Sequence, residues 1–187
     1  MHKLQFILTA AFCSLALMSR GQVTNVPPTE LETFEAQTGT VIVKGASQIG
    51  SLAVGALNIT VISKETLDVS TGRKEYGMAI ELAENNRQVW KRVVDYDEFD
   101  TFISGLDYLA RIDYPVTTLP TFTASYTTKS GFRVGAFTSQ RHSAILFFLQ
   151  DCSINGERII ISSAQLAQFQ TLVEQTRKNL DLLRIPR

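Results

Sequence analysis

Two stretches of the chain, 67 residues apart, share one order of apolar and polar residues. In each, a strand-like run passes through a polar cap into apolar positions spaced three, four and seven residues apart, the spacing of an amphipathic helix. The caps, Asp-x-x-Glu and Ser-x-x-Gln, are capping-box signatures. The aligned pairs are Asp95 with Ser162, Glu98 with Gln165, Phe99 with Leu166, Phe102 with Phe169 and Leu106 with Val173. The pattern predicts two capped helices and an internal repeat.

Strands are predicted before the first helix, where β-branched and alternating runs are separated by glycine or asparagine. The runs are 40–44, which stops at Gly45, a weaker segment from 49 to 54, and 58–69, 76–82 and 88–94. Asn85-Asn86 has the composition of a tight hairpin turn. We therefore expect four strands and then a helix.

The second half repeats this order after an extended linker, 113–120, which carries two prolines. Strands are predicted at 122–128, 132–138, 144–149 and 158–161, and Asn155-Gly156 is a strong hairpin signal. In the closing helix, the apolar residues Leu166, Phe169, Val173 and Leu180 form one stripe.

The expected fold class is α+β, with antiparallel sheet or sheets built from two ββββα modules. Short hairpins force antiparallel neighbours, and each helix needs an apolar surface to cover. We expect the helix that ends each module to pack on the sheet of its own module. The domain should span 39–187, with pseudo-repeat halves 39–113 and 120–187. The pattern leaves open whether the halves share one sheet or form two.

The N-terminal residues 1–21 have the pattern of a signal peptide, with a basic start and an apolar run of about 15 residues, too short to span a bilayer. Small residues favour cleavage after Gly21, with cleavage after Ala16 or an uncleaved anchor as alternatives. Pro27-Pro28 and a scarcity of apolar residues predict that 22–38 is an extended arm.

Charge and cysteine content narrow the function classes. Without Lys3 and Arg20, 16 of the 18 basic residues remain against 18 acidic ones, so the mature chain has no excess of positive charge to attract nucleic acid or an anionic membrane. No second apolar run is long enough to cross a bilayer, so we expect a soluble mature protein. Processing leaves Cys152 as a single cysteine, so we expect no internal disulfide, and a small apolar role for its side chain.

The densest polar cluster is the acidic run Asp95, Asp97, Glu98 and Asp100. Paired carboxylates can serve acid–base chemistry or bind a divalent cation, and negative charge also stabilises a helix N-terminus. The matching positions of the second half are uncharged and can still cap. Capping is common to both copies, so we assign the run a structural role.

His142 and Cys152 are the remaining candidates for nucleophilic catalysis or metal binding, but neither lies in a known catalytic or zinc motif. We interpret His142 as a turn residue. No catalytic residue, cofactor site or metal site is predicted. A site assembled from scattered carboxylates, Asp95, Asp97 and Asp151, would make the protein a hydrolase, and this is our first alternative.

Aromatic and basic residues are interleaved along the predicted strands. They are Trp90, Lys91, Arg92, Tyr126, Lys129, Phe132, Arg133, Phe137 and Arg141. Sheet faces of this composition bind single-stranded nucleic acid. In topology alone, a duplicated four-strand-plus-helix unit resembles the Whirly and PUR-repeat folds, which implies such binding as a second alternative. We favour aromatic side chains that face the core and cations that face water.

These observations predict an exported, periplasmic or extracellular domain without enzymatic activity, which acts as a binding or structural interaction module. The partner would be a protein, a glycan or a small molecule. Duplicated halves can form a groove or a continuous sheet where a ligand binds.

Overall fold

The computed structural model describes residues 26–139, 144–152 and 157–185. The predicted signal peptide, His142, Arg141 and the Asn155-Gly156 turn lie outside these ranges. The elements of the first half are α1 (Glu30–Glu35), β1 (Ile42–Val54), β2 (Leu57–Asp68), β3 (Lys74–Glu84), β4 (Arg87–Asp95), the 3-10 turn η1 (Tyr96–Glu98) and α2 (Phe99–Ala110). Those of the second half are the 3-10 turn η2 (Tyr114–Val116), β5 (Thr123–Thr127), β6 (Phe132–Ser139), β7 (Ala144–Asp151), β8 (Ile159–Ile161) and α3 (Ser163–Arg184).

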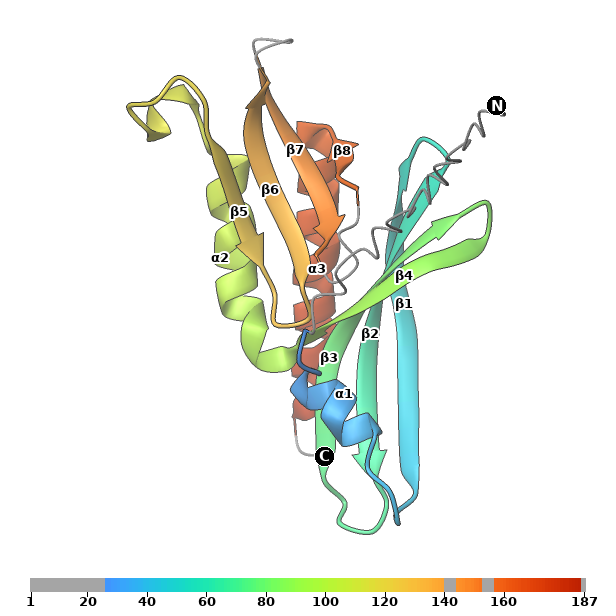
Figure 1. Cartoon of the computed structure of the whole chain (residues 1–187). Helices are drawn as coiled ribbons and strands as arrows, with labels where there is room; N and C mark the ends of the chain where they lie inside the picture. Colours follow the sequence, from blue (N-terminus) through green and yellow to red (C-terminus); the bar gives the residue numbers. More distant parts are fainter. Residues whose placement is uncertain (1–25, 140–143, 153–156, 186–187) are drawn as a thin grey trace, which may run out of the picture.

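The strands form two separate antiparallel sheets, in the orders β1-β2-β3-β4 and β5-β6-β7-β8, and each sheet is followed by a helix (Figure 1). The predicted α+β class with two ββββα modules is therefore confirmed, and the open choice between one sheet and two is decided in favour of two. Among the described residues, no helix is both long and apolar enough to span a membrane.

The first strand differs from its prediction. β1 does not end at Gly45 but continues to Val54, because the 12-residue β2 pairs with it over its whole length. A bulge between Gln48 and Gly50 interrupts the register. Gly50 also has a packing role, since a Cβ atom there would lie 2.5 Å from a methyl carbon of Leu172 on α3.

The capped helices form where the pattern places them. Asp95 and Glu98 make a capping box at η1, which leads directly into α2, and Ser162 and Gln165 make another at the start of α3. Phe102 and Phe169 are fully buried, with ring centroids 6.3 Å apart. Both helices therefore face one common core.

The expectation that each helix packs on the sheet of its own module is wrong for α2 and incomplete for α3, which packs on both sheets, with the Phe169 ring 5.9 Å from that of Phe132 on β6. α2 lies on β5 and β6 of the second sheet, whereas α3 lies across β1, β2 and β3 of the first and also contacts β7 (Figure 1). On α2, Gly105 leaves the space that the ring of Tyr126 on β5 fills. Because α2 lies on the second sheet and α3 lies between both sheets, the modules cannot be described as independent halves.

The predicted extended arm is also wrong between Glu30 and Glu35, where α1 forms. A capping box joins Thr29 and Glu32, with Thr29 N–H donating to the Glu32 carboxylate at 2.9 Å. Leu31 and Phe34 are buried. Leu31 packs over Gly77 of β3, where a Cβ atom would lie 2.9 Å from its side chain. The helix forms because it has a local cap and a docking surface.

Candidate functional site

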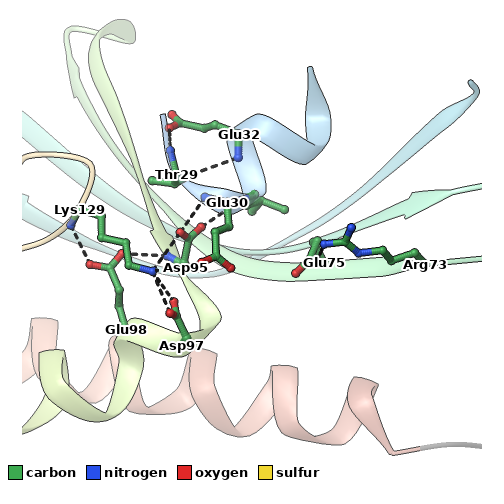
Figure 2. Close-up of polar contacts among 10 residues, drawn as sticks. Thr29, Glu30, Glu32, Arg73, Glu75, Asp95, Asp97, Glu98 and Lys129 are labelled. Carbon is green, nitrogen blue, oxygen red and sulfur yellow. Dashed lines mark hydrogen bonds and ion pairs between the residues drawn. The ribbon is translucent and has the colours of Figure 1, made fainter. Parts of the chain in front are cut away.

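The acidic run lies where β4, α1 and the β5–β6 turn meet (Figure 2). Asp95 ends β4, and its carboxylate accepts hydrogen bonds from the backbone N–H groups of Glu30 at 2.8 Å and Leu31 at 3.0 Å. Its side chain is only 3 % exposed. The carboxylate therefore holds the first turn of α1, where backbone N–H groups lack helical partners.

Glu98 joins the first module to the second. One carboxylate oxygen accepts the N–H of Asp95 at 3.2 Å, and the other accepts the N–H of Lys129 at 2.7 Å. The side chain is buried, and burial raises the pKa of Glu98, although the two backbone donors act in the opposite direction. Both oxygens of this carboxylate are used to hold backbone.

Lys129 brings the charge that balances the cluster. Its Nζ atom lies 2.9 and 2.8 Å from the two carboxylate oxygens of Asp97, 3.6 Å from Asp95 and 3.7 Å from Glu30 (Figure 2). The hydrogen bond to Asp97 is the main reason that the pKa of Lys129 is raised. Because Lys129 lies in the turn between β5 and β6, it ties the second module to β4 and α1.

This arrangement supports the structural interpretation of the acidic run. The carboxylates of Asp95 and Glu98 accept hydrogen bonds from backbone N–H groups. Asp97 is paired with Lys129, and Asp100 is paired with Arg177 at 2.8 Å. A general acid or base needs an oxygen that can reach a substrate. Within the described ranges, no group of three or more histidine, cysteine, aspartate or glutamate side chains is placed to hold a metal ion.

A hollow of about 230 Å³ opens beside this cluster. Its lining includes the rings of Tyr76 and Tyr96 and the side chains of Lys74 and Arg184. The guanidinium carbon of Arg184 lies 3.8 Å from the centroid of the Tyr96 ring. The hollow is smaller than a typical ligand pocket, and the protein's own cation already covers Tyr96. Sequence reasoning did not identify Arg184, because nothing in the helix pattern places it near η1.

Asp151, the third carboxylate of the hydrolase alternative, lies apart from Asp95 and Asp97 and has a different partner. Asp151 at the end of β7 accepts two hydrogen bonds from the Arg92 guanidinium, at 2.9 and 2.6 Å, and its side chain is fully buried. This bidentate pair joins β4 to β7, and so links the two sheets. The next residue, Cys152, is partly buried, which raises the pKa of its thiol. Asp151 therefore forms a second polar contact between the modules, in addition to those of Glu98 and Lys129.

The predicted burial of aromatic residues is confirmed for Trp90 and Phe132, which lie in the core with ring centroids 5.8 Å apart. Phe137 lies beside Phe148, and the guanidinium of Arg158 covers both rings, at 5.4 and 4.4 Å from their centroids. These rings are occupied by contacts within the chain.

The long edge of the first sheet is a surface that sequence reasoning missed, because the strand was expected to stop at Gly45. β1 is an edge strand, and residues 43–48 are exposed. The backbone carbonyl of Val41 accepts from Val69 N–H at 3.0 Å, which sets the alternation of the regular ladder that follows. The backbone groups that point away from β2 are therefore those of Ile42, Lys44, Ala46 and Gln48.

The exposed edge also carries apolar side chains and little charge. Val41 and Val43 are 66 % and 49 % exposed, and Lys44 is the one charged residue of β1. Natural edge strands are usually protected by several charges, by proline or by a covering element. β1 has a bulge at its middle, between Gln48 and Gly50, and the regular part before it is suited to accept another strand.

The chain matches no protein-family model, and no curated protein matches it.

Proposed function

We propose that the protein is an exported, non-enzymatic interaction domain that binds another polypeptide as an added strand along β1. The observation that carries the proposal is the free edge of β1, a 13-residue strand whose outer side pairs with no strand in the described part of the chain. In strand addition, backbone hydrogen bonds supply affinity, and alternate side chains supply specificity. Export rests on the signal-peptide pattern of residues 1–21.

The polar residues favour binding over catalysis. The carboxylates of the hydrolase alternative hold α1 and join the modules, and only Asp97 among them is substantially exposed, at 59 %. Nucleic-acid binding has less support because Trp90 and Phe132 are in the core, while Arg158 covers Phe137 and Phe148. A strand partner needs none of these groups.

A substitution of Ala46 separates edge binding from other modes of binding. Ala46→Pro removes a backbone N–H that points away from β2, so it should block an added strand and leave the β1–β2 ladder intact. Ala46→Ser keeps the N–H and is the matched control. The chain and both variants are used as baits for exported proteins of the source organism, with cross-linking and mass spectrometry.

A partner bound by the wild type and by Ala46→Ser, and lost with Ala46→Pro, is the expected result. If every partner is retained by Ala46→Pro, strand addition at β1 is wrong. Hydrolase screens of the wild type against Asp97→Ala test the alternative, because an activity that depends on Asp97 would replace the binding proposal.

A further inference from the structure

The free edge of β1 has features that suit one specific partner. We infer that β1 pairs antiparallel with β1 of a second copy of this chain, which would join two first sheets into a continuous eight-stranded sheet. The inference rests on the proposed function, since it names the strand that the edge accepts. It depends on the regular part of the strand, Ile42–Gln48, which precedes the bulge.

The positions of the outward-facing backbone groups are symmetric. Ile42, Lys44, Ala46 and Gln48 present their N–H and C=O groups to the free side, and the midpoint of this set is Gly45. A two-fold axis at Gly45 places Ile42 opposite Gln48 and Lys44 opposite Ala46 of the other copy. All outward-facing groups of the regular segment then find partners of the same kind, as an isologous interface requires.

Side chains near this axis are small. The two Gly45 residues would form a non-hydrogen-bonded pair, in which Cα atoms approach to about 4.5 Å. Alanine and serine follow at positions 46 and 47, and both faces of the strand are exposed from 43 to 48. Two backbones can therefore approach without steric conflict from side chains at the centre of the contact.

Charge and apolar surface also fit a second copy. Lys44, the one charged residue of β1, faces Ala46 of the other copy, so no like charges stand directly opposite. Val43, which is 49 % exposed, lies opposite Ser47 and is covered by the added strand. An unrelated peptide could use the same backbone groups; what favours a second copy is the glycine at the axis and the absence of facing like charges.

A cysteine at the axis tests the register. Gly45 has no positive φ, and a Cβ atom there meets only ordinary contacts with Glu65, the nearest at 3.5 Å, so Gly45→Cys should fold. Two such residues across a close antiparallel pair lie within the Cα separation of about 4.4–6.8 Å that a disulfide needs. The variant is made in the full chain with Cys13 and Cys152 replaced by serine. Ser51→Cys, on the same strand beyond the bulge, is the matched control.

Sedimentation velocity of the full chain between about 10 and 500 μM, a range that detects weak dimers, measures the association itself. We expect a concentration-dependent dimer, at least about 100-fold weaker in Ala46→Pro than in Ala46→Ser because the proline removes an outward N–H from each copy. We also expect mild oxidation to give a disulfide-linked dimer of Gly45→Cys and little of Ser51→Cys.

Three outcomes would overturn the inference: a monomer at the highest concentration, a dimer that Ala46→Pro leaves intact, or equal cross-linking of the two cysteine variants. A monomer whose other partners are lost with Ala46→Pro would overturn self-pairing and leave strand addition standing. A monomer whose partners all tolerate Ala46→Pro would remove both proposals.

Discussion

Removal of the Asp95 carboxylate should release α1 from the rest of the domain. In Asp95→Ala, the N–H groups of Glu30 and Leu31 lose an ionised acceptor in a buried setting. A hydrogen bond to a charged group contributes about 1.5–3 kcal/mol, so the loss of two predicts a cost of about 3–6 kcal/mol. Lys129 keeps its bond to Asp97, so no orphaned buried cation adds to this cost.

Two assays separate the local effect from the global one. Urea unfolding followed by fluorescence of Trp90, the only tryptophan, reports the free energy of the core. Hydrogen exchange of the amides between Glu30 and Ala36 reports whether α1 stays docked. We expect these amides to lose protection in Asp95→Ala before the core unfolds, since α1 is then held by burial of Leu31 and Phe34 and by the contacts of Glu35 at its other end.

The matched control is Asp97→Ala, which removes a carboxylate from the same cluster. Asp97 is 59 % exposed and, within the described residues, its carboxylate is paired with the Lys129 side chain, so its loss should cost less than about 1 kcal/mol. Equal costs for the two variants, or unchanged exchange of the α1 amides in Asp95→Ala, would refute the role assigned to Asp95.

Three further predictions test the core, the packing of α2 on β5, and the turn after β2. Phe169→Ala should cost about 3–5 kcal/mol in urea unfolding, because it leaves a cavity among buried rings, whereas Ser162→Ala should cost about 0.5–2 kcal/mol through a lost cap. Gly105→Ala should destabilise by about 1–3 kcal/mol although alanine favours helix, because its Cβ would lie 2.7 Å from the Tyr126 ring, and Tyr126→Ala in the same chain should recover part of the loss. A Gly105→Ala chain as stable as the wild type would show that α2 is not held against β5. Hydrogen bonds from three hydroxyl groups, led by that of Thr40, hold the pKa of Asp68 below its ordinary value of 3.8, so its stabilising effect is present above pH 3.8 and is lost as pH falls below it. As the pH is lowered below 3.8, the melting temperature of Asp68→Asn should therefore fall less than that of the wild type. Equal decreases in the two proteins would contradict this assignment.

Local signals predicted the capped helices because a capping box and its apolar stripe lie within one or two turns of chain. Asp95 and Ser162 are examples, since each cap needs only the next few residues. The same rule could have found α1, where Thr29 and Glu32 have the capping-box spacing. Pro27-Pro28 and the small number of apolar residues favoured an extended arm. The contact that stabilises α1 comes from Asp95, which is 65 residues away from Glu30 in sequence.

The packing of α2 on the second sheet and of α3 on both sheets could not be predicted from periodicity. A 3.6-residue pattern identifies the apolar face of a helix but does not say which sheet that face will meet. The local signs of this packing are Gly50 on β1, which makes room for α3, and Gly105 on α2, which makes room for Tyr126 of β5. Each glycine appears in the sequence as a break in a pattern, and its meaning depends on a partner far along the chain.

The ion pairs between the modules also form between residues that are far apart in the sequence. The acidic run was given a structural role by comparison with the uncharged second copy, and its contacts support that role. Its partner, Lys129, comes from the turn of the other module, and Arg92 reaches Asp151 across the two sheets. Sequence patterning places none of these partners, because the ion pairs form only after the sheets are arranged around a common core.

The two modules repeat the same order of elements but differ in the edge that each leaves open. β5, the first strand of the second module, has only five residues, and its residue Tyr126 packs against α2. β1, its counterpart, has 13 residues and extends past the part of the sheet that α3 contacts through Leu172. Because a short edge offers few backbone groups, we place the proposed strand addition in the first module. Because α3 packs on both sheets, it ties β1 to a core that both modules build.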